Sequence, residues 1–133
     1  MSATESTILL LVLWWAVLLF QLPVIRLIAS KSTGSMSFDP NGSDLEGYGR
    51  RLTRAAANCS ESIPMFIIVM LVAIVTDNSD ITNATATWLL FARVAQSVAH
   101  LISVSTPLVM ARFFFFLVQV GLALCWIVQM LMA

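Results

Sequence analysis

Four stretches of this chain are apolar over a length that suits a membrane-spanning helix. A helix needs about 20 mostly apolar residues to cross the hydrocarbon core of a bilayer. Of the 133 residues, 59% are hydrophobic and 11% are charged, so little sequence is left for a soluble domain. We therefore predict an all-α membrane protein in which residues 1–133 form one domain. The expected spans are residues 8–28, 52–76, 84–104 and 108–132.

The loops between these spans predict how the helices are arranged and oriented. Consecutive spanning helices cross the membrane in opposite directions, which gives an up-down bundle of four transmembrane helices. The net charge is zero, yet six of the seven Lys and Arg lie at or near the first and third loops. Because cytosolic loops carry the excess of basic residues, we expect these two loops in the cytosol and both termini outside. The six basic residues are Arg26, Lys31, Arg50, Arg51, Arg54 and Arg112.

Several classes of function have no support in the sequence. A nucleic-acid-binding protein needs a soluble basic face, and this chain has none. Its two cysteines, Cys59 and Cys125, lie inside apolar segments and give no disulfide framework. We find no metal-ligand spacing, no phosphate-binding glycine loop and no serine-hydrolase motif. We therefore expect a lipid bilayer as the environment, and neither a metal nor a nucleic acid as a partner.

A polar stripe opens the second span. Arg54, Asn58 and Glu61 lie at positions i, i+4 and i+7, which a helix places on one face. An ionisable group at membrane depth costs about 2.5–3.5 kcal/mol on insertion scales, so a functional site is the default interpretation. An intramembrane salt bridge that joins helices is the structural alternative. Within one helix, Arg54 and Glu61 are two turns apart, which disfavours a direct bridge between them.

The third span carries a second polar stripe of the same length. Arg93, Gln96 and His100 occupy positions i, i+3 and i+7. We expect the two stripes to line one site, with His100 at the depth of the first stripe and Arg93 nearer the middle of the membrane. Arg93 would complete the pocket wall, or pair with Glu61 or a carbonyl. His100, whose side chain titrates near neutral pH, would act as a proton-transfer group or as a neutral core histidine.

The residues of both stripes resemble those of a known family. The pattern Arg54-x-x-x-Asn58-x-x-Glu61-x-x-Pro64 is similar to the signature of the membrane-associated proteins in eicosanoid and glutathione metabolism (MAPEG), which include the microsomal glutathione transferases. Residues 91–101 resemble the third-helix stretch of the same family. Chain length, the four spans and the expected orientation agree with it, so the resemblance covers nearly the whole chain.

The resemblance implies a homotrimer of four-helix bundles that binds glutathione between subunits, at sites open to the cytosol. Glutathione carries two carboxylates and one ammonium group, so it suits a site with cations, an amide and one carboxylate. Arg54 can form a fork with a carboxylate, Glu61 can pair with the ammonium group, and Asn58 can satisfy backbone amides of the tripeptide. The implied glutathione contacts are Arg54, Asn58, Glu61 and Arg93.

Arg112 and His100 are the candidates for catalysis. Enzymes of the family usually carry an arginine near the end of the third helix that holds the glutathione sulfur as a thiolate. Here Arg112 is the only cation of residues 103–112, displaced by several residues toward the fourth span, and His100 stands where the family commonly has tyrosine. A free thiol with a pKa near 8.5 is only a few per cent ionised at neutral pH, and a nearby cation lowers that pKa. The sequence therefore leaves open whether this chain is an enzyme.

Three functions fit the sequence to different degrees. The first is a glutathione transferase or peroxidase that acts on lipophilic electrophiles or hydroperoxides. The second keeps the fold without the chemistry, as a non-catalytic subunit or scaffold with a protein partner, and the displaced arginine favours it. The third is a small proton-coupled exporter that uses Glu61 as its carboxylate. The fixed positive charge of Arg54 and Arg93 disfavours this exporter, because a site for lipophilic cations should not be lined with cations.

Overall fold

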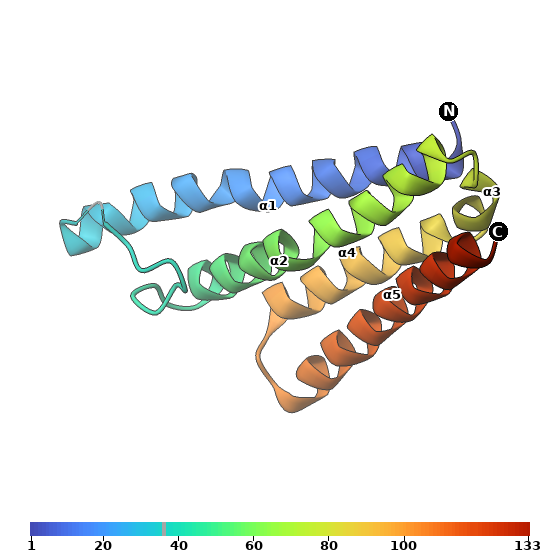
Figure 1. The fold of residues 1–133 in the computed structure, drawn as a ribbon. Helices are drawn as coiled ribbons and strands as arrows, with labels where there is room; N and C mark the ends of the chain where they lie inside the picture. Colours follow the sequence, from blue (N-terminus) through green and yellow to red (C-terminus); the bar gives the residue numbers. More distant parts are fainter. Residues whose placement is uncertain (36) are drawn as a thin grey trace.

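The four expected spans are each found as a helix, and together they form an up-down bundle (Figure 1). The computed structural model describes residues 1–35 and 37–133, and these described residues contain no strand. Long helices that follow one another in the chain run in opposite directions. The helices are α1 (Ala3–Thr33), α2 (Tyr48–Val75), α3 (Ser79–Asn83), α4 (Ala86–Ile102) and α5 (Thr106–Met132).

The lengths and surfaces of the helices suit a bilayer. α1, α2 and α5 each contain an 18-residue window with a mean hydropathy of 2.5, 2.0 and 2.1, respectively. α4 has 17 residues and is apolar. At 1.5 Å per residue it is about 26 Å long, slightly less than the roughly 30 Å of a hydrocarbon core. Large apolar side chains such as Phe20, Ile68 and Phe114 are exposed on the outer faces. The chain is therefore a multi-pass membrane protein with three to four apolar helices.

The two ends of the bundle differ. Both termini and α3 lie at one end, at the right of Figure 1, whereas the α1–α2 and α4–α5 loops lie at the other. The segment between the second and third expected spans, residues 77–83, is not all loop, because residues 79–83 form α3. Asn83 accepts hydrogen bonds from the backbone N–H and the hydroxyl of Thr4, at 3.0 and 2.6 Å. These bonds hold α3 against the start of α1.

α1 is longer at both ends than its apolar run because its ends are capped. Ser2 and Glu5 form a capping box, in which the Ser2 hydroxyl accepts from the Glu5 N–H and the Glu5 carboxylate accepts from the Ser2 N–H. At the other end Gly34 adopts a φ of 74°, and its N–H donates to the carbonyl of Ser30. Local hydrogen bonds therefore set the ends of this helix, and hydropathy sets only its middle.

The helices pack through an apolar core and a close contact between α2 and α4. Phe66, Leu89 and Trp126 are buried and belong to one cluster that joins α2, α4 and α5. Lipid tails are as apolar as these side chains, so close van der Waals packing holds such helices together. Small residues allow that packing: Cys59 of α2 and Ser97 of α4 have their Sγ and Oγ atoms 3.4 Å apart. This contact brings the two polar stripes near each other.

Candidate functional site

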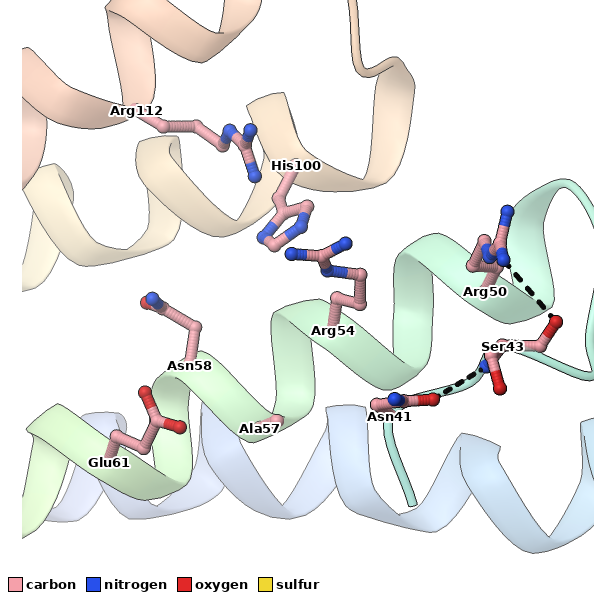
Figure 2. Close-up of a pocket in the computed structure, with 9 residues that line it drawn as sticks. All are labelled: Asn41, Ser43, Arg50, Arg54, Ala57, Asn58, Glu61, His100 and Arg112. Carbon is pink, nitrogen blue, oxygen red and sulfur yellow. Dashed lines mark hydrogen bonds between the residues drawn. The ribbon is translucent and has the colours of Figure 1, made fainter. Parts of the chain in front are cut away.

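A polar cavity of about 540 Å³ lies toward the loop end of the bundle (Figure 2). α2, α4, α5 and the α1–α2 loop all contribute side chains to it. Five of the six site residues predicted from the sequence line this cavity, and the sixth, Arg93, does not. The lining residues are Asn41, Ser43, Arg50, Arg54, Ala57, Asn58, Glu61, His100 and Arg112.

The stripe of α2 forms one wall of the polar cavity. Arg54, Asn58 and Glu61 lie on successive turns and face the same side, as their spacing predicts (Figure 2). Arg54 and Glu61 are exposed, and Asn58 is half-buried. Neither charged side chain makes a hydrogen bond or an ion pair with another described residue. Both are therefore available to a ligand.

Arg112 reaches the polar cavity because the chain reverses between α4 and α5. α4 ends at Ile102 and α5 begins at Thr106, so only three residues separate the two helices. Arg112 then lies in the second turn of α5, and its guanidinium points toward His100 and Arg54 (Figure 2). Its Nε atom is buried and has no hydrogen-bond partner among the described residues. The displacement of Arg112 along the sequence thus does not remove it from the site.

The lining of the polar cavity carries more positive than negative charge. Arg50, Arg54 and Arg112 supply three cations, whereas Glu61 supplies one carboxylate. Arg50 also donates to the backbone carbonyl of Ser43 at 3.3 Å, so it holds the loop as well as lining the cavity. A ligand with several anionic groups and one cationic group would match this pattern.

The α1–α2 loop forms one edge of the polar cavity. The Asp39 carboxylate accepts from the N–H of Asn41 at 3.1 Å and from the hydroxyl of Ser43 at 2.9 Å, and these bonds hold the pKa of Asp39 below its usual range. Gly42 has a φ of 77°, and a Cβ added to it would lie 2.9 Å from Cβ of Thr53. Glycine is therefore needed at this position for the loop to bring Asn41 and Ser43 to the cavity.

A second, smaller cavity adjoins the polar one and has a more apolar wall. Its volume is about 220 Å³. Asn58, His100 and Arg112 line both cavities, so the two spaces meet at these three side chains. The remaining wall of this apolar cavity consists of Gln96, Val109, Phe113 and Phe116. The arrangement can hold a polar ligand and an apolar ligand side by side.

Arg93 lies behind the cavities and not in their walls. Its side chain is fully buried, and its guanidinium donates to Asn58 Oδ1 at 2.8 Å, Gln119 Oε1 at 2.8 Å and Ser62 Oγ at 2.7 Å. Of the two expected partners, Glu61 or a carbonyl, Glu61 is wrong: it is on the exposed face of α2, and Arg93 donates to two amide carbonyl oxygens and a hydroxyl instead. Arg93 precedes His100 by two turns of α4, which carries its side chain past the cavity into the contact with α5.

The sequence model of the MAPEG family matches residues 6–132. The chain belongs to the MAPEG family. The match includes all four long helices and both polar stripes of this MAPEG protein. No curated protein and no solved structure matches the chain significantly.

Several residues around the site of this MAPEG protein were not singled out from the sequence. Asn41, Ser43 and Arg50 reach the polar cavity through the fold of the loop, which spacing along the chain does not reveal. Gln119 is fully buried and bonded to Arg93. A signal for Gln119 does exist, because an amide in the middle of a strongly apolar span must find a partner within the protein.

Proposed function

We propose that this MAPEG protein binds glutathione in the polar cavity and uses it against lipophilic electrophiles or hydroperoxides. The observation that supports this most is the charge pattern of the lining, which has three arginines, one carboxylate and two amides near one end of a membrane bundle. Arginines bind carboxylates through paired hydrogen bonds, so they match the two carboxylates of glutathione. Glu61 matches its ammonium group.

Arg112 is the proposed stabiliser of the glutathione sulfur. A thiol reacts as its thiolate, and a nearby cation favours that form. Arg112 lies where the two cavities meet, so a sulfur beside it would face a co-substrate held in the apolar cavity. The thiol proton would pass to His100 or water, the thiolate would attack an electrophilic carbon and form a thioether, and the leaving group would depart with the bonding electron pair and, where it is basic, take up that proton. With a hydroperoxide, two glutathione molecules would give a disulfide, an alcohol and water.

We also propose a homotrimer whose polar cavities open to the cytosol. Arg54 and Glu61 are exposed in the single chain, although they belong to the membrane-spanning α2. Charged groups in a membrane segment face protein or a water-filled cavity, so a neighbouring subunit would cover them. Both basic loops lie at the cavity end of the bundle, which supports a cytosolic opening and termini on the outer side.

Glutathione binding to the protein purified in detergent tests the proposal. We expect Arg54→Ala to weaken binding by about 10- to 100-fold, because it removes a charge-assisted contact to a carboxylate. Calorimetry measures the affinity, and the ultraviolet absorbance of the thiolate reports the state of the bound sulfur. Lys31→Ala is the matched control, since Lys31 is a basic residue at the same end of the bundle that does not line the cavity. An unchanged glutathione affinity in Arg54→Ala would contradict the assignment of the polar cavity as the glutathione site.

The same measurement separates the alternatives. Glutathione that binds without a thiolate signal would indicate a non-catalytic subunit, and a stoichiometric protein partner would then be sought by co-purification. A proton-coupled exporter has less support from the structure, because Glu61 shares its cavity with three arginines. Transport into proteoliposomes that stops with Glu61→Gln would favour the exporter and contradict our proposal.

A further inference from the structure

Four side chains form a closed hydrogen-bond network directly behind the two cavities. Arg93 of α4 donates to Oδ1 of Asn58 on α2 and to Oε1 of Gln119 on α5, both at 2.8 Å. Gln119 Nε2 donates to Gln96 Oε1 at 2.8 Å. Gln96 Nε2 then donates back to Asn58 Oδ1 at 3.4 Å. Arg93 and Gln119 have no exposed surface, and Gln96 is 6% exposed.

The cation at the centre of this network decides how each amide is turned. A guanidinium has five N–H donors and no acceptor, so every polar atom that it contacts must accept. Asn58 and Gln119 must therefore turn their oxygens toward Arg93. Gln119 is left with its nitrogen to donate to Gln96, which in turn fixes the oxygen of Gln96 toward Gln119 and its nitrogen toward Asn58. Each of the three amides has one orientation that satisfies the network.

Asn58 is the member of the network that also touches the cavities. Its oxygen accepts from both Arg93 and Gln96, which occupies the two lone pairs of an amide oxygen. Its nitrogen makes no hydrogen bond to another described residue. Asn58 lines the polar and the apolar cavity, so its free N–H groups are what it can offer to a ligand there.

We propose that Arg93 is a positioning residue that holds Asn58 as an obligate hydrogen-bond donor at the junction of the cavities. Asn58 then recognises an acceptor on the ligand, meaning a carboxylate, a carbonyl oxygen or a thiolate, and rejects a ligand N–H. A neutral amide in place of Arg93 would not do this, because an amide can accept as well as donate and would allow Asn58 to rotate. Only the identity of the ligand as glutathione rests on the function proposed above.

The orientation can be tested without any ligand. Asn58→Asp keeps an acceptor toward Arg93 and removes the donor from the cavity. We expect Asn58→Asp to be at least as thermally stable in detergent as the wild type. The double variant that carries Asn58→Asp and Arg93→Gln should be less stable than Arg93→Gln alone. An equal effect of Asn58→Asp in both backgrounds would overturn the proposal, because the Asn58 oxygen would then not depend on Arg93.

Glutathione binding tests the consequence for recognition through a double-mutant cycle. Asn58→Ala should weaken binding about 10-fold and Arg93→Gln by several-fold, whereas the double variant should bind like Asn58→Ala alone. Effects that add would mean that Arg93 only supports the fold, and would contradict the proposal. Trp126→Phe is the control for general loosening: it removes a 2.9 Å hydrogen bond to Thr85 away from the cavities, and its effect should add to that of Asn58→Ala.

Gln119 provides a second route if Arg93→Gln does not fold. Gln119→Glu still accepts from Arg93 but cannot donate to Gln96, so it should preserve stability and loosen Asn58 only through Gln96. Gln119→Met removes both bonds of Gln119 within the network, as well as its bond to the Phe115 carbonyl, and should weaken glutathione binding more than Gln119→Glu does. The reverse order would overturn the proposal. If the wild type does not bind glutathione, the proposed function fails, while the stability cycle still decides the orientation of Asn58.

Discussion

The guanidinium of Arg112 points toward Arg54, so two positively charged side chains face each other. Arginine stays protonated in proteins, which means that this repulsion cannot be relieved by losing a proton. An anion that contacts both groups would remove the repulsion and would gain two charge-assisted contacts. At the scale of single residues, the site therefore favours a thiolate or a carboxylate between α2 and α5.

Replacing Arg112 should affect chemistry more than binding. We expect Arg112→Ala to lower kcat/KM for a generic electrophile by about 100-fold, as for the loss of one preorganised electrostatic contact. The affinity for glutathione should change much less. The pH–rate profile should move to higher pH, because a thiol without the cation returns toward its free pKa of about 8.5. Steady-state kinetics as a function of pH, together with the thiolate absorbance, measure both effects.

Arg26→Ala is the matched control for this variant. Like Arg112, Arg26 has a buried Nε without a partner among the described residues, but it lies on α1 and lines neither cavity. Arg112→Lys should retain part of the rate, since it keeps the charge. An equal loss of rate in Arg26→Ala, or an unchanged thiolate signal in Arg112→Ala, would contradict the role given to Arg112.

The candidate site could be predicted only in part, for a reason that individual residues make clear. Arg54, Asn58 and Glu61 share one helix, so its periodicity alone places them on one face. The position of Arg112 depends on the reversal after Ile102, and that of Gln119 depends on how α5 packs against α4. Neither position can be predicted from spacing along the sequence.

At the scale of elements, hydropathy located the long helices but not their ends. It measures the preference of a segment for lipid, whereas caps and turns depend on single hydrogen bonds. Arg51 is an example outside the cavity lining: its Nε donates to the carbonyl of Leu101 at 2.8 Å and satisfies the last turn of α4. The loop between α1 and α2 is another, since it has no apolar pattern and yet forms an edge of the polar cavity.

The α1–α2 loop should tolerate no side chain at Gly42. Gly42→Ala would force a positive φ on alanine, at a cost of about 1–2 kcal/mol, and would add a clash with Thr53. We expect lower thermal stability and a several-fold loss of glutathione affinity, because Asn41 and Ser43 would shift. Thermal unfolding in detergent and calorimetry measure these two effects.

Gly34→Ala separates backbone strain from the shape of the loop. Gly34 has a similar φ of 74°, but a Cβ added there would meet nothing within 4 Å, and Gly34 does not line the cavity. Gly34→Ala should therefore lower stability without changing glutathione affinity. If both variants bind glutathione equally well, the loop is not part of the binding site.

At the scale of the whole molecule, the polar groups are arranged along the length of the bundle. The polar cavity lies toward the end that carries the two basic loops, the Arg93 network lies deeper, and α3 and the termini form the opposite end. The helical membrane architecture and the family follow from the sequence, because both depend on long apolar segments and on residues within single helices. The trimer and the orientation of the protein in the membrane stay predictions, because a single chain without a bilayer shows neither of them.

The orientation can be measured by labelling single cysteines. In a chain that carries Cys59→Ala and Cys125→Ala, Glu46→Cys places a thiol in the first loop, and Ala3→Cys places one near the amino terminus. We expect a membrane-impermeant maleimide added on the non-cytosolic side of a sealed membrane to label position 3 only, and to label position 46 only after permeabilisation. Both positions are exposed in the structure, so access through the protein does not limit the reaction. The opposite pattern would put the polar cavity on the non-cytosolic side of the membrane.

The shared boundary of the two cavities has a consequence for how a reaction cycle would end. A glutathione conjugate fills both cavities as one molecule and loses its translational and rotational freedom once, whereas the two reactants lose theirs separately. The conjugate would therefore bind more tightly than either reactant, and more so as its apolar part covers Phe113 and Phe116. Product release, and not bond formation, would then limit the rate of turnover. The most lipophilic co-substrates would be turned over most slowly.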